Sequence, residues 1–121
     1  MHRQVNVIGV GMTPFKTPKH AEPYTVMSTA AARMALDDAG IAYHTVEQAY
    51  VGYVYGDSTA GQRVIHDVGM SGIPVFNVNN NCATGSSALY LARQVDNAHI
   101  ALPHNIGLGG CCVVTLYERA A

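Results

Sequence analysis

The order in which β-prone and helical runs alternate restricts the fold of this 121-residue chain more than any other feature. Runs rich in valine, isoleucine and tyrosine predict strands over residues 5–10, 50–55, 74–79, 100–106 and 111–117. Apolar residues at helical spacing predict helices over residues 23–39, 62–68 and 82–95. The resulting order, βαβαβαββ, predicts an α/β fold with a five-stranded, mostly parallel sheet and crossover helices.

Glycine and proline mark the ends of these elements. We expect Gly9 and Gly11, followed by Pro14, at the exit of the first strand. Pro23 suits the first position of the first helix, and Gly40 suits its C-terminal cap. The chain is long enough to bury one core, so residues 1–121 are interpreted as a single domain.

Cys82 stands where the third predicted strand passes into the third predicted helix. Three asparagines precede it, and the small residues Ala-Thr-Gly-Ser-Ser follow it. Unpaired N–H groups and the dipole at a helix N-terminus favour the thiolate form of a cysteine, which is the nucleophile in covalent acyl transfer. The alternative is a small buried cysteine that only packs at the strand–helix joint. The asparagine run and the Gly-Ser-Ser opening favour the nucleophile.

This segment resembles the nucleophile segment of the thiolases, in particular the thiolase domain of the sterol carrier protein X and lipid-transfer type. The most specific motif is Asn79-Asn-Asn-Cys82-Ala-Thr-Gly-Ser-Ser87. The resemblance extends to residues 7–15, 51–59, 61–63, 101–110 and 113–117, and so to nearly the whole chain. It implies a 3-oxoacyl-CoA thiolase of lipid metabolism, associated with fatty acid β-oxidation and lipid transport.

The resemblance also implies an unusual domain organisation. Residues 1–97 resemble the N-terminal part of a thiolase, and residues 98–121 resemble its last two strands, with a junction near residues 95–98. Thiolases are several-fold longer and consist of two halves of βαβαβαββ topology, so this chain corresponds to one thiolase-like half. The third helix of a lone half leaves an apolar face, which predicts a homo-oligomer, most simply a dimer.

For the chemistry, the resemblance implies that Cys82 attacks a 3-oxoacyl-CoA and holds the acyl group until coenzyme A, the co-substrate, accepts it. The backbone N–H groups of Cys82 and Gly107 would form the oxyanion site. Many thiolases carry a second catalytic cysteine where Asn105 stands here. The His-Asp-Cys-Phe and Gly-His-Pro motifs, the acid/base groups of the sterol carrier type, are not in this sequence. We therefore expect impaired turnover, by roughly 10²–10⁴ for each missing group.

Three further residues are candidates for the substrate pocket: Asn81, His104 and Asn105. For the asparagines, the alternative is that they satisfy backbone groups at the turn. For His104, the alternative is a hydrogen-bonded strand histidine, which we favour. Because the two copies of the topology are merged, we also expect Gly107 to face the Cys82 of a partner subunit rather than its own.

Composition and spacing exclude several partners. The net charge of −1 and the 12% charged residues argue against nucleic acid, and no apolar run approaches the roughly 20 residues of a membrane span. Adjacent Cys111 and Cys112 point to opposite faces of a strand, so we expect no metal site and no bound cofactor. The three cysteines form no disulfide framework. An intracellular protein is expected. The resemblance implies the peroxisome, whereas the sequence carries no targeting signal, which leaves the cytoplasm open.

Parts of the sequence suggest three other functions. A dinucleotide-binding fingerprint requires a glycine where Pro14 follows Gly9 and Gly11, so that function is rejected. A non-catalytic acyl-CoA or lipid-binding form, or a vestigial one, is the main alternative because the acid/base motifs are missing. A ketosynthase would share the cysteine at the head of a helix, but the asparagine-rich motif favours the degradative type. The length of the acyl chain cannot be derived from the sequence.

Overall fold

A computed structural model describes residues 4–94, 98–107 and 111–121. Its elements follow the predicted order βαβαβαββ with one added 3₁₀ turn, η1. They are β1 (Val5–Met12), α1 (Tyr24–Ala39), η1 (Tyr43–Thr45), β2 (Gln48–Gly52), α2 (Ala60–Val68), β3 (Val75–Val78), α3 (Thr84–Arg93), β4 (Ile100–Ile106) and β5 (Cys112–Arg119).

The strands form one five-stranded sheet in the order β1-β5-β4-β2-β3. The pairs β2–β3 and β2–β4 are parallel, whereas β4–β5 and β1–β5 are antiparallel. β5 therefore runs against the other four strands, because it follows β4 directly without a crossover helix. The α/β class and element order are confirmed, and the mostly parallel sheet is more accurately a mixed sheet.

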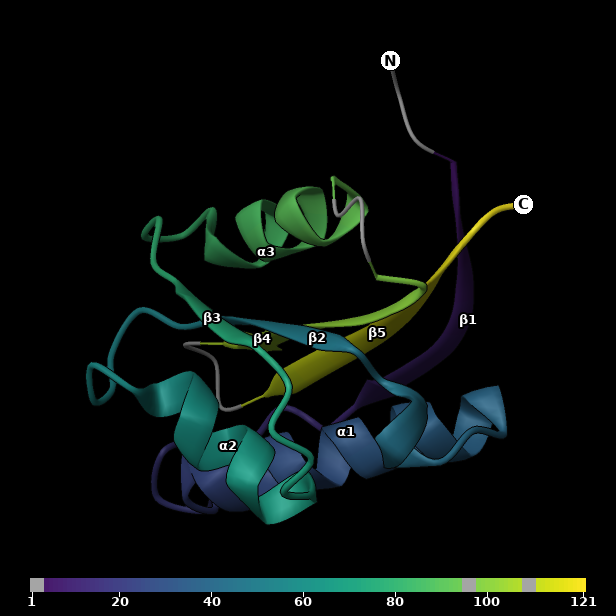
Figure 1. Cartoon of the computed structure of the whole chain (residues 1–121). Coiled ribbons are helices and arrows are strands. Elements are labelled where there is room, and N and C mark those ends of the chain that lie inside the picture. The colour runs from purple at the N-terminus through teal and green to yellow at the C-terminus, as the bar shows by residue number, and fades with distance from the viewer. Residues whose placement is uncertain (1–3, 95–97, 108–110) are drawn as a thin grey trace.

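Helices cover both faces of this sheet (Figure 1). α1 and α2 lie together on one face, and α3 lies alone on the other. The larger core fills the space beneath α1 and α2, and a smaller cluster under α3 consists of Tyr50, Ala88, Ala92 and Ala101. Because this cluster is smaller, the sheet face under α3 has less buried apolar packing than the face under α1 and α2.

The glycines of β1 allow α1 to pack closely. A Cβ atom at Gly9 would stand 2.4 Å from the carbonyl oxygen of Ala35, and one at Gly11 would stand 2.1 Å from that of Ala31. β1 continues to Met12, so the prediction that Gly9 and Gly11 end the strand is wrong. Gly40, in contrast, has the predicted left-handed C-cap conformation, with φ of 66°.

Most predicted boundaries shift by one or two residues, and two near the site matter for its geometry. The strand predicted over residues 50–55 is β2 at Gln48–Gly52, and the helix predicted to start at Cys82 starts at Thr84. Its predicted end at Val95, like the proposed junction at 95–97, lies outside the described residues.

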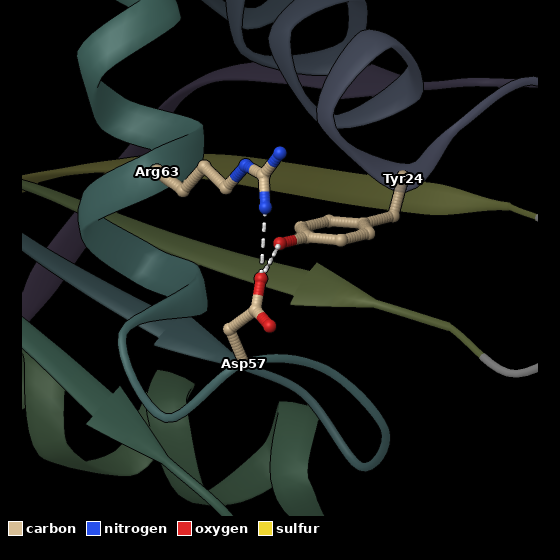
Figure 2. Close-up of polar contacts among 3 residues, drawn as sticks. All are labelled: Tyr24, Asp57 and Arg63. Carbon is tan, nitrogen blue, oxygen red and sulfur yellow. Dashed lines mark hydrogen bonds and ion pairs between the residues drawn. The ribbon is translucent and has the colours of Figure 1, made fainter.

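The loop between β2 and α2 is held by Asp57 (Figure 2). Its Oδ2 accepts hydrogen bonds from the Arg63 guanidinium at 2.9 Å and from the Tyr24 hydroxyl at 3.4 Å. One carboxylate thus joins the start of α1, the loop and α2. The contact is exposed, so we assign it a role in orienting the loop rather than a large stabilising energy.

In the described ranges, no helix combines the length and the apolar character needed to cross a bilayer. The same ranges contain no group of three or more His, Cys, Asp or Glu side chains placed to hold a metal ion.

Candidate active site

Cys82 lies in the short turn between β3 and α3, two residues before the helix begins. Its side chain is exposed and its thiol is free, whereas Cys111 and Cys112 are free but buried. The alternative of a buried packing cysteine is therefore wrong for Cys82. Burial raises the pKa of both the Cys111 and Cys112 thiols, so these are the less reactive cysteines.

The asparagines before Cys82 bind the turn to its surroundings. The Asn80 backbone N–H donates to Thr84 Oγ1 at 2.7 Å, and the Asn80 carboxamide donates to Ser87 Oγ at 2.9 Å. The Asn79 carboxamide donates to the carbonyl of Val54 at 3.3 Å and accepts from the Asn81 N–H at 3.3 Å. These bonds connect the turn to the first turns of α3 and to the loop after β2.

Asn81 has the left-handed conformation, with φ of 50°. Asparagine tolerates this conformation better than most residues, because its short polar side chain can bond locally. Its Oδ1 lies 3.8 Å from Cys82 Sγ and can accept a hydrogen bond from the thiol. Asn81 therefore both turns the chain and orients the cysteine.

Two glycines bring the head of α3 down onto the sheet. A Cβ atom at Gly52 would stand 2.5 Å from Thr84 Cγ2, and one at Gly85 would stand 2.9 Å from Asn105 Cγ. Only glycine at these positions lets Thr84 and the Asn105 carboxamide occupy their places. Sequence reasoning missed this packing. A glycine inside a helix is unfavourable by about 1 kcal/mol relative to alanine, and Gly85 could have been questioned on that ground.

Removing the Thr84 hydroxyl is expected to loosen this turn. Thr84→Val keeps the shape that fits over Gly52, but it leaves the Asn80 N–H without its acceptor. We expect a loss of about 1–2 kcal/mol in the free energy of unfolding, measured by urea denaturation. Thr84→Ser, which retains the hydroxyl, is the matched control. If Thr84→Val were as stable as wild type, the Asn80–Thr84 bond would contribute nothing.

Two adjoining cavities meet at Cys82. The larger, of about 290 Å³, lies between α3 and strands β4 and β5, and the smaller, of about 200 Å³, lies beside the loop after β2. The larger is lined by Cys82, Gly85, Ser86, Leu89, Pro103, His104, Asn105, Val113 and Thr115. The smaller is lined by Val54, Asn81, Cys82, Thr84, Asn105, Ile106 and Gly107.

Most predicted site residues meet at these cavities. Asn81, Asn105 and Gly107 line the smaller cavity together with Cys82 of the same chain. The expectation that Gly107 would reach only the Cys82 of a partner subunit is therefore wrong. Because β3 and β4 both run parallel to β2, the Gly107 end of β4 lies at the same sheet edge as the β3–α3 turn.

His104 has a different position from the one proposed for a pocket residue. Its Nε2 lies 3.0 Å from the carbonyl oxygen of Ser28 in α1, on the face of the sheet opposite α3. The side chain is 1% exposed, and burial lowers its pKa to about 4, against the opposing hydrogen bond to Ser28. Only the backbone of His104 can border the larger cavity, so its side chain is not a substrate ligand. The strand-histidine interpretation is the one the geometry favours.

Solved structures with the same fold include a condensing enzyme and a thiolase. The solved structure of a tetronic acid condensing enzyme, AbyA1, superposes with a TM-score of 0.84 and 15% identity, covering 98% of this chain and 53% of that chain. At this identity the likeness shows the fold alone. Human mitochondrial 3-ketoacyl-CoA thiolase in complex with CoA superposes with a TM-score of 0.75 and 25% identity, covering 84% of this chain and 29% of that chain.

The sequence comparison is more specific. The thiolase N-terminal domain matches residues 5–101, and the chain belongs to the thiolase family. Sterol carrier protein 2 of Gallus gallus is 50% identical over 123 aligned residues, which include 100% of this chain and 21% of that protein. The chain thus spans about a fifth of the length of this curated relative.

Proposed function

We propose that this chain accepts an acyl group from acyl-CoA on Cys82, as the acyl-transfer half of a 3-oxoacyl-CoA thiolase reaction related to that of the sterol carrier type. The observation that carries the proposal is the position of Cys82, whose exposed thiol lies at the head of α3 where two cavities meet. The cavities provide room for an acyl chain on one side of the thiol and for a pantetheine thiol on the other.

In the proposed step, Cys82 Sγ loses its proton to solvent and attacks the acyl carbonyl carbon. A bond forms between Sγ and that carbon, and the carbonyl oxygen becomes an oxyanion. The bond from the carbon to the departing group then breaks, and the leaving CoA thiolate, or the leaving carbanion of a 3-oxoacyl substrate, takes up a proton from solvent. Backbone N–H groups of Cys82 and Gly107 are the proposed oxyanion donors.

A second candidate function, non-catalytic binding of acyl-CoA or lipid, is favoured by a different observation. Among the described residues that line the two cavities, only Cys82 and His104 are titratable, and the His104 side chain lies on the other face of the sheet. The cavities thus provide no general base for CoA and no acid for the carbanion. We therefore propose that acylation of Cys82 is slow and that the full thiolase cycle turns over little. If Cys82 is not acylated at all, binding of acyl-CoA or lipid is the function that remains.

Assembly and location are part of the proposal. Tyr90 and Leu91 on α3 are 63% and 42% exposed, and such an apolar face fits a second copy of the chain in a dimer.

The assignment of residues 98–121 to the C-terminal strands of a thiolase also stays a proposal. We propose an intracellular location, in the peroxisome by relation to the sterol carrier type or otherwise in the cytoplasm.

Intact-protein mass spectrometry tests the function. Wild-type protein is incubated with acetyl-CoA and, separately, with a 3-oxoacyl-CoA, and peptide mapping then locates any acyl group. We expect one acyl group, on the Cys82 peptide and not on the peptide that holds Cys111 and Cys112. A folded protein that gains no acyl mass would reject acyl transfer and leave the binding function.

A further inference from the structure

Asn105 occupies a central place at the site. It lies on β4, paired with Gly52 of β2 on one side and with Val113 of β5 on the other. Its carboxamide packs against the start of α3, where a Cβ atom at Gly85 would stand 3.1 Å from Oδ1 and 3.2 Å from Nδ2. Of the described residues, Asn105 and Cys82 alone line both cavities.

The Asn105 carboxamide has a donor and an acceptor group that no described residue uses. Within the part of the chain that the structure describes, its Oδ1 and Nδ2 take part in no hydrogen bond, although the residue is half-buried. The other asparagines near Cys82 are committed: the Asn79 and Asn80 carboxamides bind the turn, and Asn81 Oδ1 faces the thiol. A half-buried amide that no neighbour satisfies is available to a ligand in the cavity.

We propose that Asn105 is a catalytic residue whose Nδ2 donates a hydrogen bond to the carbonyl oxygen of the acyl group that Cys82 attacks. This inference rests on the proposed function and deepens it. As the Sγ–carbon bond forms, the electron pair of the carbonyl moves onto its oxygen, and the pair returns when the bond to CoA breaks. A fixed amide donor aimed at that oxygen stabilises the charge while it exists, without taking up or releasing a proton.

The geometry also explains why Gly85 accompanies Asn105. An alanine at position 85 would overlap the carboxamide and push it away from the junction of the two cavities. Ser86 and Thr115, the other polar side chains of the larger cavity, do not line the smaller one. Among the described residues, Asn105 therefore has the polar side chain best placed to contact the carbonyl oxygen of an acyl group bound at the Cys82 thiol.

The test compares Asn105→Leu, which keeps the shape but has no donor, with wild type and with Asn6→Leu, the same change at an exposed position of β1 outside both cavities. Acylation by acetyl-CoA is followed as mass gained with time. Thiol reactivity is followed separately with methyl methanethiosulfonate, which contains no carbonyl group. We expect Asn105→Leu to acylate roughly 10²-fold more slowly than wild type, with its methanethiosulfonate reactivity and the Asn6→Leu acylation rate both within about threefold of wild type.

Two results would overturn the inference while the proposed function stands. In the first, Asn105→Leu acylates within about threefold of wild type. In the second, its methanethiosulfonate reactivity falls as far as its acylation rate, which would mean that Asn105 only positions the thiol. A wild-type protein that reacts with methanethiosulfonate but never gains an acetyl group would instead refute the proposed function itself. Circular dichroism of each variant verifies that it is folded.

Discussion

Replacing Cys82 by serine is expected to abolish acyl-adduct formation, with a fall in rate of at least ~10³-fold. A serine hydroxyl is a weak nucleophile unless a base removes its proton, and among the residues lining the two cavities no side chain that faces them can act as that base. Because the thiol is exposed, the exchange of sulfur for oxygen leaves the core unchanged. The measurement is the acyl mass gained by Cys82→Ser and by wild type under identical incubation with acetyl-CoA.

The buried cysteines provide the control. Cys111→Ala and Cys112→Ala remove thiols that are 3% and 0% exposed and whose pKa values burial raises, so both variants are expected to acylate like wild type if they fold. A Cys82→Ser protein that still gains an acyl group would contradict the assignment. Peptide mapping would then identify the group that reacts.

The secondary structure was largely predictable, because the strands and helices of this chain carry clear local signals. The left-handed cap at Gly40 and the start of α1 after Pro23 depend only on local backbone preferences. The end of β2 and the start of α3 differ from the prediction, and the contact between Gly52 at that end and Thr84 at that start joins residues that are distant in sequence. The role of Gly9 and Gly11 was missed for the same reason, since it depends on α1 lying across β1.

The candidate site was likewise predictable where local sequence decides the structure, and not where contacts between distant elements decide it. Cys82 and Asn81 could be selected from the sequence because a strand, a turn and a helix follow one another there. His104 and Asn105 were both proposed for the pocket, although successive residues of a strand point to opposite faces, so only one of them could project its side chain into it. Sequence alone could not say which, because the answer depends on which face α1 covers. The Ser28 carbonyl of α1 meets His104, and α3 meets Asn105.

Acidification is expected to destabilise this protein through His104. The ordinary histidine pKa of 6.5 applies to the unfolded chain, whereas the folded protein holds the pKa of His104 at about 4. Between these values the unfolded state binds a proton that the folded state does not, so stability is complete above about pH 6.5 and falls as the pH drops toward 4. The shift corresponds to a loss of about 3 kcal/mol over that interval.

The measurement is the free energy of unfolding in urea at several pH values from 7 to 4, for wild type and for His104→Gln. Glutamine can still donate to the Ser28 carbonyl but does not titrate, so the difference between the two proteins isolates His104. Glu47 has a lowered pKa, because its carboxylate accepts hydrogen bonds from the Ile100 and His99 N–H groups. Its protonation therefore destabilises the folded state only as the pH falls below the ordinary glutamate pKa of 4.5, and it does so in both proteins alike. Parallel pH curves for the two proteins would mean that His104 is not buried in neutral form between α1 and the sheet. A wild-type curve that falls more steeply by about 3 kcal/mol would show that the folded protein holds the His104 imidazole in its neutral form.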